Sequence, residues 1–139
     1  MDRLTPEQRK RNMQRVKSKD TSIELKLRRA LWHEGIRYRK NYSGLPGHPD
    51  IVLMKYKIAI FCDSSFFHGK DYETRKKPET NPGFWKKKIE RNMEHDTEVN
   101  RQLFMLGWGV IRFWDYEINR HLNECVKTVK EMIFDSING

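Results

Sequence analysis

The sequence has few of the features that mark secreted or membrane-bound proteins. It contains only two cysteines, Cys62 and Cys125, which lie far apart and belong to no CxxC motif. This usage predicts a reduced, cytoplasmic protein without a structural zinc ion. No apolar run approaches the roughly 18 residues that a membrane-spanning helix needs. The first ten residues also lack an apolar segment, so we expect no signal peptide.

The sequence is also short of acidic residues relative to basic ones. Lysine and arginine total 28, aspartate and glutamate total 19, and the formal net charge is +9. This surplus predicts a polyanionic partner. It does not select an enzyme, because structural RNA-binding proteins are basic too. The length of 139 residues suits a single domain with one core, and we see no internal repeat.

Residues 1–20 form a polar, basic segment with few apolar anchors. Thr5, Pro6 and Gln8 are typical of a helix start, and the helix would continue to about Val16. Because burial contributes little to such a helix, two interpretations stay open: a solvated arm, or an arm that orders on DNA phosphates. We therefore divide the chain into an N-terminal helical arm, 1–20, and a core, 21–139.

Helical and strand-like patterns alternate along the core. The expected elements are a helix (21–34), three strands (36–40, 50–54 and 57–62), a loop (63–81), a long helix (81–106), a strand (108–114) and a final amphipathic helix (118–133). This order predicts an α/β fold with a mixed central sheet flanked by helices.

Three candidate site residues gather at one end of the expected sheet. Asp50 opens one strand, Asp63 follows the next strand, and His68 lies in the loop after it. Because the start of an antiparallel strand lies beside the end of its neighbour, these groups should be close together. Carboxylates suit Mg²⁺, and an imidazole can act as a base near neutral pH. Taken singly, Pro-Asp is also common turn chemistry and a lone histidine is more often structural.

The loop and the start of the long helix carry aromatic and basic residues with two open interpretations. Phe66 and Phe67 either fold back onto the core or form a wedge that inserts between base pairs. Trp85 would join such a wedge. Lys86, Lys87 and Lys88 suit either DNA phosphates or a solvated face.

Polar residues within the predicted helices also have two interpretations. Glu24 has the spacing to form a capping box with Thr21, which would be a purely structural task. Asn92 and Asp96 fall on the apolar stripe of the long helix, where they need either a partly open site or buried partners.

The chain resembles the very short patch repair (Vsr) DNA mismatch endonucleases of the PD-(D/E)xK nuclease superfamily, with Pro49-Asp50 as the PD element. The likeness runs from Arg9 to Trp114, in the blocks RKRNMQRVKSKDTSIELKLRRAL, LPGHPDIV, IFCDSSFFHG, FWKKKIERNMEHD and LGWGVIRFW. It implies a restriction-endonuclease-like αβββαβ core followed by a C-terminal helix. It also implies a Mg²⁺-dependent hydrolase that nicks one strand beside the thymine of a T:G mismatch, which arises when 5-methylcytosine deaminates.

The resemblance also implies roles for single residues. Asp50 matches the metal-binding aspartate, and Cys62 matches a position that offers its backbone carbonyl to the metal. His68 matches the proposed general base, Asp96 the acid that supports it, and Glu24 a further site residue. The DNA-binding matches are an aromatic wedge (Phe66, Phe67 and Trp85), a minor-groove residue of the arm (Met13) and positions near the mismatched pair (Lys88 and Asn92).

Two departures from the family pattern change these expectations. The positions of a structural zinc set in the best-known members carry Ser65, Lys70, Tyr72 and Tyr116, which are no plausible zinc ligands, so no structural zinc is expected. The loop must then be held in another way or order only on DNA. Asp63 stands where the family tends to place a second site histidine, and a carboxylate there predicts a further metal ligand.

Several alternatives remain beside the T:G nickase. They are another nuclease of the superfamily (restriction or junction-cleaving), a non-catalytic DNA-binding module, and a basic RNA-binding protein. For the nickase we expect Mg²⁺ as cofactor, with Mn²⁺ as a candidate substitute, and double-stranded DNA with a T:G mismatch as partner. We further expect a cytoplasmic monomer without membrane contact, with mismatch-repair proteins as candidate partners.

Overall fold

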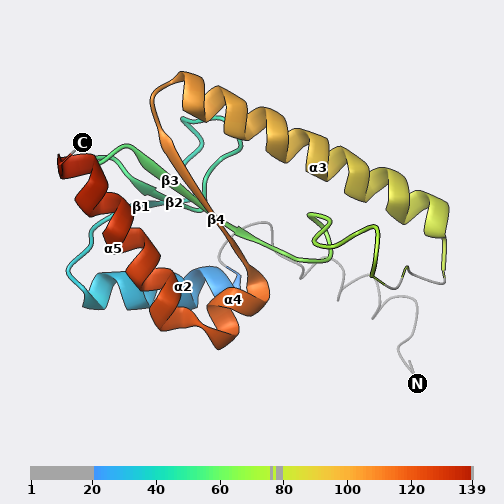
Figure 1. Cartoon of the computed structure of the whole chain (residues 1–139), viewed down its shortest axis with the longest axis horizontal. Helices are drawn as coiled ribbons and strands as arrows, with labels where there is room; N and C mark the ends of the chain where they lie inside the picture. Colours follow the sequence, from blue (N-terminus) through green and yellow to red (C-terminus); the bar gives the residue numbers. More distant parts are fainter. Residues whose placement is uncertain (1–20, 76, 78–79, 139) are drawn as a thin grey trace.

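In the computed structural model, a four-stranded mixed sheet lies between helices on both of its faces (Figure 1). The structure describes residues 21–75, 77 and 80–138, so the predicted arm helix and Met13 lie outside the described residues. The elements are α2 (Ser22–His33), β1 (Arg39–Lys40), β2 (Ile51–Leu53), β3 (Ile58–Asp63), α3 (Pro82–Met105), β4 (Gly109–Trp114), α4 (Asp115–Arg120) and α5 (Leu122–Asn138). This is the α/β architecture expected of a restriction-endonuclease-like core.

The sheet has the order β1-β2-β3-β4, and only its last pair is parallel. Strands β2 and β3 form a hairpin, in which Ile51 pairs with Ile60. The parallel pair β3–β4 needs a long crossover, which α3 supplies. Asp63 pairs with Trp114 at the last position of both strands, so the segments that follow them leave from the same edge of the sheet.

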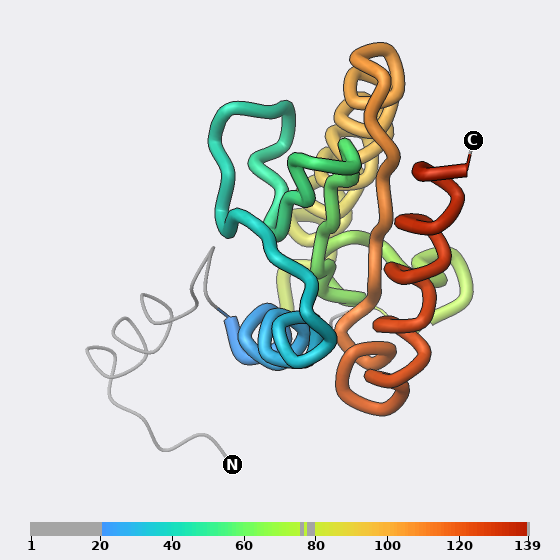
Figure 2. Tube along the Cα trace, turned by 90° about the vertical axis from the view of Figure 1, so that its left-hand side faces the viewer, coloured from blue at the N-terminus to red at the C-terminus, as the bar shows by residue number. Residues whose placement is uncertain are grey.

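Strand β3 is buried on both faces because its alternate residues contact different helices. Ile58 and Ile60 belong to the core formed with α2, α4 and α5, whereas Ala59 and Phe61 pack against Val99 and Leu103 of α3. On the first face α5 runs beside β4 (Figure 2). The sheet is therefore a rigid platform for whatever stands at its edge.

Helix α3 is longer than the sheet that it covers. Its C-terminal half packs on the sheet, whereas its N-terminal half extends over the loop that follows β3 (Figure 1). Gly69 in this loop has φ +75°, and a Cβ there would lie 2.3 Å from Sδ of Met93 and 3.2 Å from Cγ2 of Ile89. The glycine therefore allows the loop to approach the helix closely.

Three sequence-based expectations about secondary structure need correction. The single final helix is wrong, because the chain turns at His121 so that Ile118 of α4 and Val126 of α5 reach the same core. The first strand is shorter than expected, because the Ile36 amide closes α2 by donating to the Leu31 carbonyl. The predicted capping box is also wrong, since the Thr21 side chain makes no capping hydrogen bond.

No helix among residues 21–75, 77 and 80–138 combines the length and the apolar character that crossing a membrane requires.

Candidate active site

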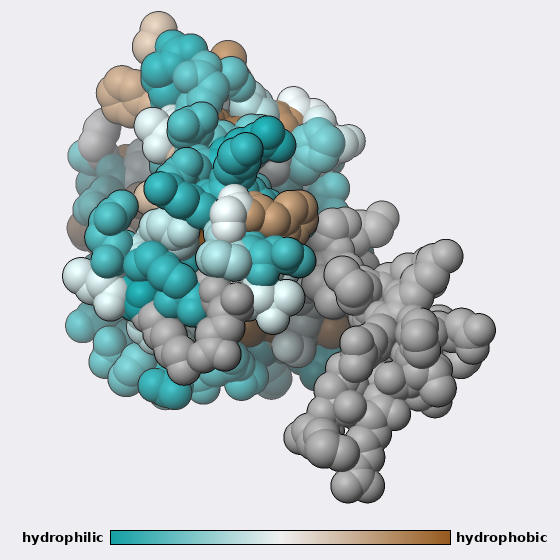
Figure 3. Space-filling view, turned by 90° about the vertical axis from the view of Figure 1, so that its right-hand side faces the viewer, coloured by the Kyte–Doolittle hydropathy of each residue, from teal (hydrophilic) through white to brown (hydrophobic). Residues whose placement is uncertain are grey.

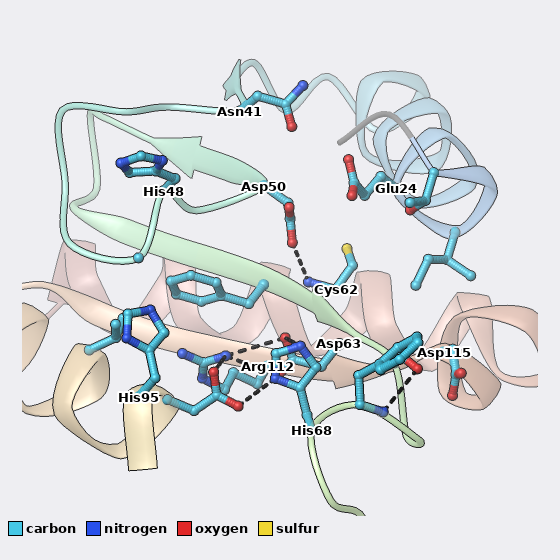
Figure 4. A pocket seen from close by; sticks show the side chains of 18 of the residues that line it. Glu24, Asn41, His48, Asp50, Cys62, Asp63, His68, His95, Arg112 and Asp115 are labelled. Atoms are coloured by element: carbon cyan, nitrogen blue, oxygen red, sulfur yellow. Dashed lines mark hydrogen bonds and ion pairs between the residues drawn. The ribbon is translucent and has the colours of Figure 1, made fainter. Parts of the chain in front are cut away.

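A cleft of about 980 Å³ opens at the sheet edge where β2 begins and β3 and β4 end. It is lined by residues that the sequence had singled out: Glu24, Asp50, Cys62, Asp63, Phe67, His68 and Asp96. They come from α2, the start of β2, the end of β3, the following loop and α3, and Figure 4 shows how most of them converge. The topology thus brings together side chains as far apart in sequence as Glu24 and Asp96, a separation of roughly half the length of the chain.

Asp50 lies just before β2, and its carboxylate faces the neighbouring strand. Its Oδ2 accepts a hydrogen bond from the Cys62 backbone amide at 2.7 Å. Burial raises the pKa of Asp50 to about 7; the Cys62 amide opposes this rise, and the negative charges of Glu24 and Asp63 add to it. A half-buried carboxylate surrounded by further negative charge is a place that a divalent cation would stabilise.

Glu24 lies on the first turn of α2, and its carboxylate points toward Asp50 across the cleft (Figure 4). The residue is only 2 % exposed. This orientation explains why the expected capping box does not form: the side chain is directed into the cleft and not back to its own helix end. Glu24 and Asp50 together offer the hard oxygen donors that Mg²⁺ prefers.

Cys62 contributes to the site through its backbone. Burial, followed by the charges of Asp50, Glu24 and Asp63, holds the pKa of its thiol well above the usual range. The sulfur therefore stays protonated at neutral pH and is a poor metal ligand. This agrees with the implied role of the Cys62 carbonyl, which stays a prediction.

His68 forms a short pair with Asp96, whose carboxylate reaches it from α3. Nδ1 of His68 lies 2.5 Å from Oδ2 of Asp96, which leaves Nε2 directed toward Asp63 at 3.9 Å from its Oδ1. Burial lowers the pKa of His68, but the Asp96 hydrogen bond and the charges of Asp63 and Asp96 outweigh it, so the pKa is raised. A carboxylate on one ring nitrogen orients the imidazole and makes the other nitrogen a better base.

Arg112 on β4 is the site residue that sequence reasoning missed. Its Nη1 donates to both Asp63 oxygens, at 3.0 and 3.2 Å, and lies 3.5 Å from Oδ1 of Asp96. Its Nε donates to Asn100 at 2.8 Å, and the guanidinium lies over the Phe61 ring at 4.0 Å. The signal in the sequence was a lone arginine in the apolar strand GVIRFW. Arg112 joins the two carboxylates that flank His68.

Two groups of side chains could hold a cation, and they differ in charge. Asp63, His68 and Asp96 have ligand atoms within 4.8 Å of one another. Arg112 contacts both of these carboxylates, so its charge would repel a metal ion bound there. Asp50 and Glu24 offer oxygen donors farther from this guanidinium (Figure 4). The metal role of Asp63 stays a prediction. Arg112 is an alternative partner for this carboxylate.

The aromatic residues of the loop pack against one another and belong to neither hydrophobic core. The Phe66 ring lies 5.1 Å from Phe67 and 5.3 Å from Trp85, both edge to face. Nζ of Lys88 lies about 6 Å above Phe67 and Trp85, at 5.9 and 5.8 Å. Figure 3 views this end of the molecule, where the coloured surface is mostly hydrophilic with isolated apolar groups.

Asn92 lies on the apolar stripe of α3, and its side-chain amide has a hydrogen-bond partner in the loop after β3. Its Nδ2 donates to the Phe67 carbonyl at 2.8 Å. One turn further along α3, Asp96 holds His68. The polar interruption of the α3 stripe is therefore the surface on which the loop after β3 is fixed.

The chain is similar to known DNA endonucleases. A family model described as DNA mismatch endonuclease Vsr matches residues 1–74. The type II nicking enzyme V.NmeDIP of Neisseria meningitidis serogroup C is 48 % identical over 136 residues, which cover 97 % of this chain and 92 % of the relative. The type II nicking enzyme V.HpaIIP of Haemophilus parainfluenzae is 43 % identical, with 97 % of each chain covered. The DNA mismatch endonuclease Vsr of Escherichia coli strain K12 is 36 % identical, over 77 % of this chain and 69 % of its own. These matches show that the chain belongs to the Vsr family of DNA endonucleases.

Proposed function

We propose that this protein nicks one DNA strand beside the thymine of a T:G mismatch, such as deamination of 5-methylcytosine creates, by Mg²⁺-dependent hydrolysis. The observation that carries the proposal is the convergence of Asp50 and the His68–Asp96 pair in one cleft. Relatives named as nicking enzymes and one named as a mismatch endonuclease support the choice of substrate. We further propose that the protein is a cytoplasmic monomer and that it interacts with mismatch-repair proteins.

The Asp50 carboxylate and the Cys62 carbonyl would hold the metal ion, with Glu24 beside them. When bound, Mg²⁺ neutralises phosphate charge and makes water easier to deprotonate. Glu24 and Asp50 prepare this place by bringing negative charge into a buried position, which is the reason for the raised pKa of Asp50. A divalent cation held by these two carboxylates would remove that electrostatic cost.

His68 acts as the general base in the proposed reaction. Its Nε2 takes a proton from the attacking water, while Asp96 on Nδ1 stabilises the imidazolium that forms. The water oxygen bonds to phosphorus, the bond to the 3′ oxygen breaks, and the released 3′ oxygen takes up a proton from solvent water. The nick then carries a 3′ hydroxyl and a 5′ phosphate.

The aromatic cluster supplies the preference for damaged DNA. Phe66, Phe67 and Trp85 enter the base stack, and Lys88 and Asn92 stand near the mismatched pair. Unstacking costs a few kcal/mol and is least at a mismatch, so an inserted wedge favours such sites. The basic arm with Met13 would approach from the other groove.

The direct test is a cleavage assay on a panel of substrates. We expect a single nick in the thymine strand of T:G duplexes with Mg²⁺ or Mn²⁺, dependent on the bases that flank the mismatch, and none with EDTA. Cleavage of matched duplexes or four-way junctions at equal rates would point to another nuclease of the superfamily. DNA binding without cleavage in either metal would point to a binding module, and a preference for RNA to an RNA-binding protein.

The variant Asp63→Asn separates the two roles of that carboxylate. Because both oxygens accept from Arg112, we expect the variant to lose about tenfold in kcat through disturbed support of His68. The Mg²⁺ concentration for half-maximal rate should stay unchanged. An increase of tenfold or more in that concentration would instead establish Asp63 as the metal ligand that the sequence predicts.

The variant Arg112→Gln provides the matched comparison. If Asp63 acts through Arg112, the double variant should be no slower than the slower single variant, because both changes remove the same contact. Additive losses in kcat would contradict this pairing.

A further inference from the structure

Arg75, in the loop between β3 and α3, has no part in the chemistry described above. Its Nη1 donates to the Ser65 carbonyl at 2.7 Å, and its Nη2 donates to the Phe66 carbonyl at 2.8 Å. The side chain is partly buried, and the guanidinium carbon lies 5.1 Å from the Phe66 ring centre and 5.3 Å from that of Tyr72. Arg75 thus points toward its own loop. The net charge of +9 would lead one to expect arginine side chains that face a polyanionic partner.

The aromatic segment is held from two sides. Arg75 takes the carbonyls of Ser65 and Phe66, and Asn92 of α3 takes the next one, that of Phe67. Three consecutive carbonyls thereby accept hydrogen bonds from side chains. The following residue is His68, whose ring is held by Asp96. These hydrogen bonds from Arg75 and Asn92, which we call the clamp, therefore position both the aromatic wedge and the proposed base.

A second cation supports this arrangement. Nζ of Lys77 donates to the carbonyls of Tyr72 and Arg75, the latter at 3.0 Å, and lies 4.5 Å from the Tyr72 ring centre. The contacts therefore form a row in which rings and cations alternate: Phe66, Arg75, Tyr72 and Lys77. Such contacts are favourable, and they fix a segment that has no helix or strand of its own among the described residues.

We propose that Arg75 is a positioning residue that orders the Phe66–Phe67 wedge and His68 before DNA binds. The inference rests on the proposed function, because it assigns Arg75 a task in mismatch cleavage. Guanidinium suits this task because its rigid fork can serve two carbonyls and stack on rings at the same time. An ammonium group carries the same charge but cannot reproduce the fork.

The prediction compares Arg75→Ala, Arg75→Lys and a control, Arg101→Ala. We expect both Arg75 variants to lose about 10- to 100-fold in kcat on a T:G duplex, because a misplaced base and wedge are costly to realign. Affinity for a matched duplex should change less than threefold, since the Arg75 donors face protein carbonyls. The control Arg101→Ala removes the same charge from an exposed pair with Glu98 on α3, and it should leave kcat unchanged.

Hydrogen exchange gives a readout that does not depend on activity. The amides of His68 and Lys70 donate to the carbonyls of Ser64 and Ser65. We expect these amides to exchange at least tenfold faster in both Arg75 variants, while those of α5 and the melting temperature stay unchanged.

Two results would overturn the assignment. The first is normal loop exchange and kcat in Arg75→Ala. The second is restoration of both by Arg75→Lys, together with a salt-dependent loss of matched-duplex affinity in Arg75→Ala, as a phosphate contact would give. If the unmodified protein cleaves no T:G duplex, the proposed function fails, but loop exchange still tests the clamp.

Discussion

Asp50→Asn is expected to abolish nicking and, at the same time, to stabilise the metal-free protein. The rate should fall about a thousandfold or more, because the substitution removes the charge that would hold the metal. Asparagine keeps an oxygen that can accept the Cys62 amide, so the loss would not reflect a broken hydrogen bond. The gain in stability has a separate cause, the electrostatic cost of a half-buried carboxylate beside Glu24 and Asp63.

The sign of the stability change follows from the raised pKa of Asp50. The folded protein holds this proton up to about pH 7, whereas an unfolded chain releases it near the ordinary value of 3.8. Asp50 therefore lowers the free energy of unfolding as pH rises from about 4 to 7. Asp50→Asn lacks this loss, so it should match the unmodified protein at pH 4 and exceed it by about 4 kcal/mol at pH 8.

Urea unfolding in EDTA at both pH values measures this difference. Asp135→Asn, an exposed change on α5, is the control and should alter stability little at either pH. Added Mg²⁺ should stabilise the unmodified protein at pH 8 and not the Asp50 variant. A variant that is less stable at pH 8, or a difference that does not vary with pH, would contradict the uncompensated charge at this position.

Asp96→Asn is expected to lower kcat by about 10²- to 10⁴-fold and to change its pH dependence. The base must be neutral to accept a proton, so kcat rises with pH through the pKa of His68. In the unmodified protein this rise should lie above 6.5, the ordinary value, because the pKa of His68 is raised. Removing the Asp96 charge removes part of that increase, so the rise should move to lower pH while its plateau falls.

The measurement is kcat between pH 5.5 and 9 at saturating Mg²⁺, which keeps Asp50 ionised throughout. Glu94→Gln, an exposed change on the same helix, should leave the profile unchanged. If Asp96→Asn lowers the plateau without moving the rise, then His68 is not the group whose deprotonation limits the rate.

The parts of the fold that the sequence predicts are those with strong local signals. The apolar runs of β2 and β3 and the long pattern of α3 leave few alternatives, and the PD element marks the start of β2. The break at His121 could not be predicted, because apolar periodicity continues through it and only the shared core requires the turn. Residue spacing likewise suggested a cap for Glu24, whereas tertiary contacts direct it to Asp50.

The sequence predicts which residues belong to the site better than it predicts which of their side chains contact one another. Asp50, Asp63 and His68 could be placed at one edge from strand order, but their partners depend on long-range contacts. Asp96 was paired with His68 by family resemblance, and Arg112 was missed because a charged residue in a strand usually faces solvent. The sequence predicts a metal-ligand role for Asp63, whereas its hydrogen bond with Arg112 becomes visible only in the structure.

The aromatic loop shows how tertiary structure separates two open interpretations. The sequence left Phe66 and Phe67 either on the core or exposed as a wedge. The structure packs them against Trp85 and outside both cores, which supports the wedge interpretation. Neighbouring side chains on α3 and in the loop then set its position.

In the proposed reaction, Asp50 binds the cation and His68 deprotonates the attacking water in the same cleft. Anomalous diffraction from crystals soaked in Mn²⁺ locates the cation directly. The proposed site predicts a peak at the Asp50 carboxylate and the Cys62 carbonyl, with Nε2 of His68 facing it across the cleft. A peak held by Asp63, His68 and Asp96, with none at Asp50, would contradict it.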